Sequence, residues 1–98
     1  MFPLAVSADT TFLDRPFLER CREIARAGFG VDFWLWTGRE ADLEAVAADP
    51  GVRVSSFSGY VGGSLVHPDG LQMFLDGVHK TLPVARKLRC RDLALTTG

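Results

Sequence analysis

The chain alternates short apolar runs with longer segments of helical periodicity, and this alternation restricts its fold more than any other feature. The four apolar runs are expected strands, at residues 2–8, 30–36, 52–59 and 91–98. The segments between them are expected helices, at residues 16–28, 39–49 and 69–88. Strands separated by helices pair in parallel, because each helix returns the chain to the starting edge of the sheet. The sequence therefore predicts an α/β fold with the order β-α-β-α-β-α-β.

Pro16, Gly28 and Pro83 shape the expected helices. Proline suits the first helical turn, so the first helix should open at Pro16. Gly28 readily adopts the left-handed conformation that ends many helices. Pro83 lies inside the longest expected helix, where it removes one backbone hydrogen bond, so we expect a kink without a break. The apolar stripe of that helix comprises Leu71, Phe74, Leu75, Val78, Leu82 and Ala85.

Composition narrows the class of protein. The 98 residues suit one domain, with 47% hydrophobic residues and a net charge of -1. A net charge this close to zero gives no overall attraction for nucleic acid, so nucleic-acid binding would need a local basic patch. No apolar run is long enough for a membrane span and the N-terminus does not resemble a signal peptide, so we expect a cytoplasmic protein. Cys21 and Cys90 form no C-x-x-C motif and are expected to be buried, reduced thiols.

Several phrases resemble one family. "PFLERCREIARAGF" followed by "VDFW", and "HPDG" before "FLDGVHKTLPVARKLRCRDLALTTG", resemble the N-terminal part of the hydroxypyruvate isomerase family. This family belongs to the xylose isomerase-like TIM barrels of the sugar phosphate isomerase/epimerase superfamily. The resemblance implies that residues 1–98 form the first half of a (β/α)8 barrel, whose usual length is about 250 residues. We therefore expect an incomplete barrel domain that continues beyond Gly98 in the natural gene product.

The resemblance also implies an activity. Family members move a proton between adjacent carbons of a small hydroxy-carbonyl or sugar substrate, here hydroxypyruvate or a sugar. An ene-diolate forms and is stabilised by polar donors or by a divalent metal such as Mg²⁺ or Mn²⁺. The acids that bind the metal and move the proton lie on later strands in this family. The chain is therefore assigned no catalytic residue and no metal ligand, and alone it is expected to be inactive.

Asp32 is the one acid in the apolar stretch "AGFGVDFWLWTG". A carboxylate in such a place needs a partner, water or a raised pKa. Strand alternation would put Asp32 and Trp34 on one face, with Val31, Phe33 and Leu35 on the other. The resemblance places Asp32 where the family usually has glutamate, and we predict that it faces the barrel lumen and contacts substrate. A purely structural role, with hydrogen bonds to the strand, remains the alternative.

The carboxyl-terminal ends of the strands should build the rim of the active site. The residues expected there are Ser7, Asp9, Trp36, Thr37, the loop 58–67, Thr96 and Thr97. Trp36 and His67 are predicted, with Asp32, to bind the substrate. His67 has a pKa range suited to acid/base work, although a lone loop histidine is more often solvated. "GYVGGS" lacks the lysine and spacing of a phosphate loop, so its glycines are read as letting the loop turn.

Two other functions compete with this activity. The chain alone would expose strand edges, which favours a self-associating half-barrel or a small α/β binding module without catalysis. Exposed edges also make a homo-oligomer an expected state of the chain. A DNA-repair endonuclease branch shares the barrel superfamily. Since the sequence has neither excess positive charge nor His and Asp/Glu clusters for metals, we expect no nucleic-acid partner.

Overall fold

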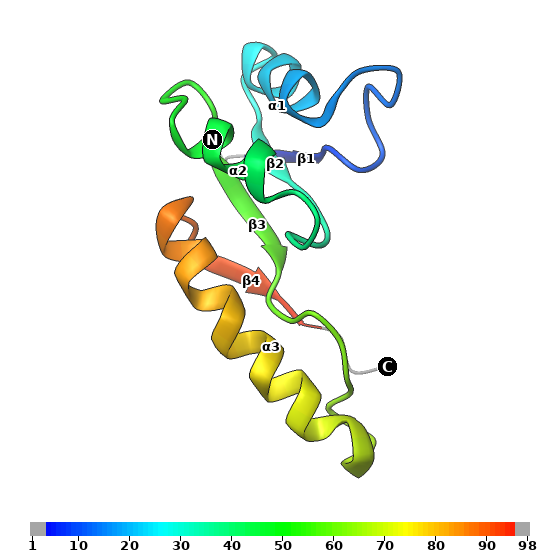
Figure 1. Ribbon diagram of the computed structural model, residues 1–98. Coiled ribbons are helices and arrows are strands. Elements are labelled where there is room, and N and C mark those ends of the chain that lie inside the picture. Colours follow the sequence, from blue (N-terminus) through cyan, green and yellow to red (C-terminus); the bar gives the residue numbers. More distant parts are fainter. Residues whose placement is uncertain (1–3, 96–98) are drawn as a thin grey trace.

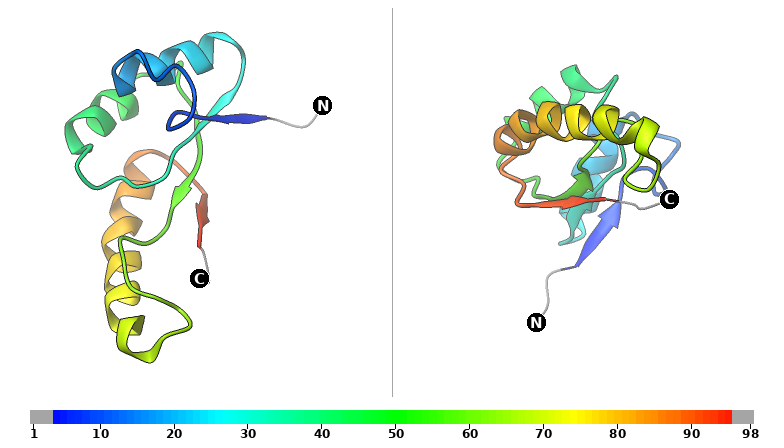
Figure 2. Two further views of the ribbon diagram at one scale, coloured as in Figure 1. Left: turned by 90° about the vertical axis from the view of Figure 1, so that its right-hand side faces the viewer. Right: turned by 90° about the horizontal axis from the view of Figure 1, so that it is seen from below.

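The computed structural model describes residues 4–95, which form a parallel sheet with helices against one of its faces (Figures 1 and 2). The strands are β1 (Ala5–Ser7), β2 (Gly30–Asp32), β3 (Val54–Ser58) and β4 (Asp92–Ala94). The helices are α1 (Phe17–Arg26), α2 (Glu40–Ala47) and α3 (Pro68–Lys87). The four strands lie in the order β1-β2-β3-β4 and all pair in parallel. This confirms the predicted α/β fold and its half-barrel order.

The core lies between the sheet and the three helices. Phe33 stacks on Phe57 with ring centroids 4.9 Å apart, and Phe17 from α1 meets the edge of Phe33 at 5.6 Å. Cys21 and Cys90 are free thiols buried in this layer, as predicted. Burial disfavours the thiolate and raises the pKa of Cys21 to about 12, so this thiol is unreactive at neutral pH.

A bulge in β3 sets which side chains leave the core. Val31 pairs with Val54, whereas the next residue, Asp32, pairs with Ser56, so Ser55 is an extra residue on β3. Val54 and Phe57 consequently both reach the core although they are three residues apart. The bulge brings Ser56 opposite Asp32 on the face without helices.

Strand β2 is shorter than the predicted strand 30–36. Val31 and Phe33 are buried on the helix side as expected, and Trp34 is exposed on the other. Leu35 was expected beside Val31 and Phe33 but is exposed, while Trp36 packs against the core. Alternation therefore fails after Trp34, because the chain leaves the sheet to reach α2. The other strands are also shorter than predicted, and residues 96–98 lie outside the described part of the chain.

Helix α3 passes through Pro83 unbroken and buries Phe74 and Ala85 of the predicted stripe, but its buried face is rotated away from the predicted leucines. Its buried residues are Phe74, Gly77, Thr81 and Ala85, and the leucines at 71, 75 and 82 are exposed. Gly77 allows the close approach, since a Cβ there would lie 2.8 Å from the backbone nitrogen of Val61. The Thr81 hydroxyl donates to the Gly77 carbonyl at 2.7 Å, which makes its burial possible.

The loop 59–67 packs along the first turns of α3. The Tyr60 ring stacks on Phe74 with centroids 4.9 Å apart. Gly63 has φ +84°, and a Cβ there would lie 2.4 Å from the Gly70 carbonyl oxygen, so only glycine fits. Figure 1 shows this loop and the start of α3 at the lower end of the molecule, beyond the strands.

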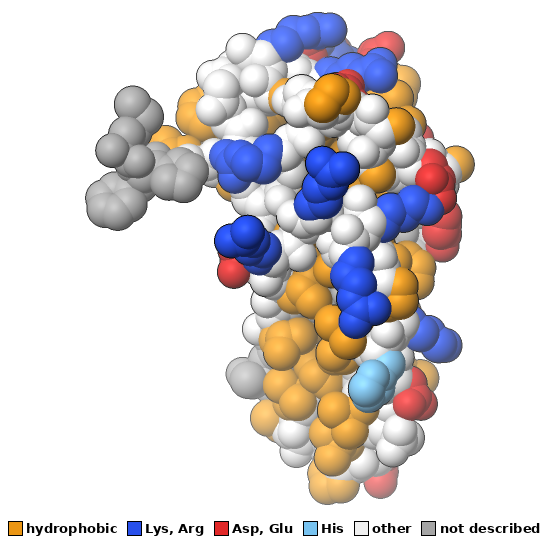
Figure 3. Space-filling view, turned by 90° about the vertical axis from the view of Figure 1, so that its left-hand side faces the viewer, with side chains coloured by type: hydrophobic (Ala, Val, Ile, Leu, Met, Phe, Trp, Pro, Cys, Tyr) orange, Lys and Arg blue, Asp and Glu red, His pale blue; other side chains and the backbone are white. Residues whose placement is uncertain are grey.

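Apolar and basic side chains occupy different halves of one face of the molecule. Figure 3 shows apolar side chains gathered over the lower half of that face and basic ones over the upper half. Within residues 4–95, none of the helices combines the length and the apolar character that crossing a membrane requires.

Candidate functional site

A row of polar residues crosses the face of the sheet that carries no helix. Ser7 pairs with Asp32, Asp32 with Ser56, and Ser56 with Asp92. Residues paired in parallel strands point to the same face, so all four side chains belong to one row. Leu93 and Phe57, their neighbours in sequence, pack on the opposite face against the core. The helix-free face is therefore polar, as the wall of a ligand site must be in part.

Asp32 is half-buried in the centre of this row. The Ser56 hydroxyl donates a hydrogen bond of 2.9 Å to its Oδ1 atom. Within residues 4–95 no further hydrogen bond reaches this carboxylate. A single hydroxyl partner and partial exposure to water together explain how an acid is tolerated in so apolar a stretch. One carboxylate oxygen remains able to accept a hydrogen bond from a ligand.

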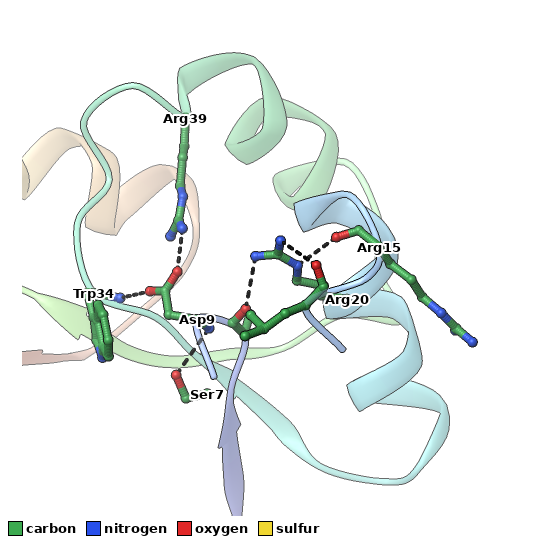
Figure 4. A network of polar contacts seen from close by, with 8 residues as sticks. Ser7, Asp9, Arg15, Arg20, Trp34 and Arg39 are labelled. Atoms are coloured by element: carbon green, nitrogen blue, oxygen red, sulfur yellow. Dashed lines mark hydrogen bonds and ion pairs between the residues drawn. The ribbon is translucent and has the colours of Figure 1, made fainter. Parts of the chain in front are cut away.

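Asp9 and Arg39 form a second polar cluster at the carboxyl ends of β1 and β2 (Figure 4). Arg39, just before α2, forms an ion pair with Oδ1 of Asp9 and lies over the Phe17 ring at 4.3 Å. The backbone N–H of Trp34 donates to Oδ2 at 2.6 Å. Burial by itself would raise the pKa of the Asp9 carboxyl, but the Arg39 and Trp34 hydrogen bonds and the charges of Arg39 and Arg20 outweigh it. The pKa of Asp9 is lowered, and the side chain stays ionised.

The loop after β1 is built to hold Asp9 in place. The Ser7 hydroxyl accepts a hydrogen bond of 3.2 Å from the Asp9 N–H. Arg20, on α1, donates from Nε to the Arg15 carbonyl at 2.6 Å and from Nη1 to the Ala8 carbonyl at 3.4 Å. Figure 4 shows Arg20 and Arg39 reaching this loop from two different helical segments. The position of the carboxylate is therefore set by α1, β2 and the start of α2 together.

A cavity of about 210 Å³ opens beside this cluster. Its lining residues are Asp9, Trp34, Leu35, Thr37 and Arg39. The Trp34 side chain is 59% exposed. The Nη1 atom of Arg39 is buried and has no hydrogen-bond partner in the described part of the chain. The cavity thus combines a polar lining with an exposed indole, but its lining residues include no pair of groups that exchange a proton near neutral pH, so it is suited to binding and orienting a small polar ligand.

The structure separates the three residues predicted to bind substrate. Asp32 lies in the polar row, whereas the Trp36 indole turns toward the helices and donates from Nε1 to the Thr81 hydroxyl at 2.9 Å. His67 is exposed at the residue before α3, where its N–H donates to Ser64 Oγ at 3.2 Å. No hydrogen bond or ion pair between described residues joins the three. Of the expected rim, Thr96 and Thr97 lie outside the described residues.

Arg39 and Ser56 belong to the site but were not predicted. Asp9 was expected at the rim, and the arginine directly before the second helix was a signal that its charge would be balanced. Ser56 could not be placed from the sequence, because the bulge at Ser55 changes the register.

The described residues bring together no group of three or more His, Cys, Asp and Glu side chains that could hold a metal ion. The two acids of the polar row, Asp32 and Asp92, are separated by β3. This donor set does not fit a divalent metal, and no chemical step is assigned to a metal held by this chain. Comparison with family models, with curated proteins and with solved structures finds no match to this chain.

Proposed function

We propose that this chain is the N-terminal part of a hydroxypyruvate isomerase-like enzyme with a (β/α)8 barrel. The enzyme would act on hydroxypyruvate or a sugar by proton transfer through an ene-diolate, and it would be cytoplasmic. The chain itself would contribute the binding wall of the site. Residues that move the proton, and any divalent metal, would come from elsewhere in the complete barrel.

The observation that carries this proposal is the polar row on the helix-free face, centred on Asp32. In a closed barrel this face becomes the lumen. Ser56 fixes the Asp32 carboxylate at 2.9 Å, and the cavity beside Asp9 opens at the carboxyl ends of β1 and β2, where barrel enzymes bind substrate. Hydroxyl and carbonyl oxygens of a small substrate suit the polar lining of this cavity. Substrate contacts by Asp32, Trp36 and His67 stay predictions, since none of the three side chains lines this cavity.

Binding of hydroxypyruvate to the 98-residue chain tests the proposal. Trp34 lines the cavity and Trp36 does not, so ligand should change the fluorescence of wild type and of Trp36→Phe, but not of Trp34→Phe. Asp32→Asn should weaken binding about tenfold, the loss expected when one hydrogen bond to a charged group is removed. Asp69→Asn, an exposed acid at the start of α3, is the matched control.

Two results would contradict the proposal. One is an absence of any saturable response to millimolar hydroxypyruvate or ketose. The other is equal affinity in wild type and Asp32→Asn. The isolated chain should show binding without turnover, because it supplies no proton-transfer pair.

A second candidate function, self-association without catalysis, is favoured by the exposed stripe on α3. Leu71, Leu75 and Leu82 lie at spacings of four and seven residues, which place them along one side of the helix. Strands β1 and β4 also occupy the edges of the sheet. A half-barrel of this kind would bury these surfaces against another copy. Saturable binding of hydroxypyruvate distinguishes the two candidates, because self-association alone does not predict it.

A further inference from the structure

A second cavity lies at the opposite end of the strands from the site described above. It has a volume of about 380 Å³ and is lined by Ala5, Arg53, Val54, Ser55, Arg89, Arg91 and Asp92. Arg53 directly precedes β3, and Arg91 directly precedes β4. The cavity is therefore at the amino-terminal ends of these strands, away from Asp9 and Arg39.

The charge of this cavity is unbalanced. Three guanidinium groups face one carboxylate, that of Asp92, so positive charge exceeds negative by two. None of the three arginines forms a salt bridge with a described residue. Like charges gathered around one cavity repel each other, and an anion placed between them removes that repulsion.

Arg53 is held in position over β2. Its Nη1 donates to the Ser55 hydroxyl at 2.8 Å. A Cβ on Gly30 would lie 2.1 Å from Ser55 Oγ and 2.7 Å from Arg53 Nη2, so the absence of a side chain at Gly30 leaves room for this serine and for the end of the Arg53 side chain. Arg53 therefore lies over Gly30, where no side chain blocks it, and is hydrogen-bonded to the bulged Ser55.

Arg89 occupies a backbone position that normally holds glycine. Its φ is +55°, and the N–H groups of Arg89 and Cys90 donate to the carbonyls of Arg86 and Ala85 to end α3. Helix α1 ends with the same pattern of bonds and uses Gly28 there, at φ +92°. The last carbonyls of α3 are already capped by backbone groups, so capping does not explain the arginine side chain. A non-glycine residue with a strained backbone at such a position indicates that its side chain has a function of its own.

Several basic residues outside this cavity are paired: Arg22 with Asp49, Arg26 with Glu23, and Lys87 with Glu44. Arg86, in the last turn of α3, does not line the cavity. Nucleic-acid surfaces need a row of free cations along several phosphates. A single compact group of three arginines suits one small dianion instead, and a phosphate monoester carries close to two negative charges at neutral pH.

We propose that the cavity formed by Arg53, Arg89 and Arg91 binds the phosphate group of a small phosphate monoester or inorganic phosphate. The guanidinium groups donate hydrogen bonds to the phosphate oxygens, with Arg53 oriented by Ser55. This site goes beyond the proposed function, because it lies at the other end of the strands and shares no residue with the cavity at Asp9. Asp92, at the start of β4, is the one residue of the polar row that also lines it.

Calorimetric titration of the 98-residue chain with inorganic phosphate, and separately with glycerol phosphate, tests the site. Both should bind with one site per chain. Arg53→Gln, Arg89→Gln and Arg91→Gln should each weaken binding about tenfold, as expected for loss of a charge-assisted hydrogen bond. Arg26→Gln is the matched control, since this arginine is exposed and already paired, and it should bind like wild type. Circular dichroism verifies that each variant is folded.

Three outcomes would overturn the proposal. The first is phosphate affinity that is unchanged in the folded Arg89→Gln and Arg91→Gln variants. The second is equal loss in the Arg26→Gln control, which would indicate a general charge effect. The third is an oligonucleotide that binds more tightly than glycerol phosphate, with affinity falling steeply as salt rises, which would assign the arginines to nucleic acid. Loss of hydroxypyruvate binding in Asp32→Asn with intact phosphate binding would separate this site from the proposed function.

Discussion

Asp9 and Arg39 form an ion pair that connects the end of β1 to the start of α2, thirty residues further along the chain. Only 7% of the Asp9 side chain is exposed, and its second oxygen accepts the Trp34 N–H. The pair therefore joins the first two βα units at the carboxyl ends of β1 and β2, and both residues line the small cavity there. The contribution of this ion pair to the free energy of unfolding can be measured, because both side chains are largely removed from water when the chain folds.

Asp9→Asn should lower the free energy of unfolding by about 1 to 3 kcal/mol, because Arg39 is left partly buried without its partner. The effect should depend on pH. The folded-state pKa of Asp9 lies below its ordinary value of 3.8, so the stabilisation is present above pH 4 and is lost as pH falls through the lower folded value. Urea unfolding of both proteins at pH 7 and pH 3 should show a difference that shrinks in acid. A constant difference would assign the effect to packing alone.

Thr81→Val should destabilise the attachment of α3. The Thr81 hydroxyl is fully buried, accepts from Trp36 Nε1 at 2.9 Å and donates to the Gly77 carbonyl at 2.7 Å. Valine keeps the shape but leaves the indole N–H unpaired, which should cost about 1 to 3 kcal/mol. A double-mutant cycle with Trp36→Phe should give a coupling energy of at least about 0.5 kcal/mol. Additive losses would mean that the hydrogen bond contributes nothing of its own.

The order of elements was predictable because each depends on local sequence. Helical periodicity placed all three helices, and apolar runs placed all four strands. Gly28 was predicted as a left-handed helix end and has φ +92°. These features follow from short-range backbone preferences, which a sequence displays directly.

Features set by tertiary packing were not predictable in the same way. Ser56 reaches Asp32 only because of the bulge at Ser55, and no residue type marks that position as a bulge. The rotation of α3 was also missed, since Gly77 and Thr81 look neutral beside leucines at helical spacing. Their burial depends on Val61 and Trp36, which lie on other segments. The site shares this dependence: Ser7, Asp9, Asp32 and Thr37 were expected at it, whereas Ser56 and Arg39 were not.

Asp32→Asn should leave the fold intact. The Asn oxygen can still accept the Ser56 hydroxyl, and the side chain is half-buried, so the free energy of unfolding should change by less than about 1 kcal/mol. In a complete barrel that contains this chain, kcat/KM should fall more than tenfold, or about 1.4 kcal/mol. If the role of Asp32 were structural only, the melting midpoint would drop while activity per folded molecule stayed at the wild-type level.

Arg89→Gly should raise stability by up to about 1 kcal/mol, because glycine adopts φ +55° without the strain that a side chain causes. For a domain of this size the melting midpoint would rise by about 4 to 8 °C per kcal/mol. Arg86→Gly, in the last turn of α3, is the matched control and should instead lose about 1 kcal/mol. A loss of stability in Arg89→Gly would show that the arginine side chain supports the fold.

The exposed side of α3 should cause the purified chain to self-associate. Leu75 is 42% exposed in the middle of the leucine stripe, and Figure 3 shows apolar side chains gathered over the lower part of the molecule. Contiguous apolar surface of this kind marks an interaction face on a small protein. Sedimentation at micromolar concentrations should therefore show a monomer–dimer equilibrium. Leu75→Glu should shift it toward monomer, because pairing would bury an unpaired charge. Gln72→Glu adds the same charge on the same helix at a polar position and should change the equilibrium less. A monomer at every concentration would contradict this prediction, and equal effects of the two variants would assign the association to another surface.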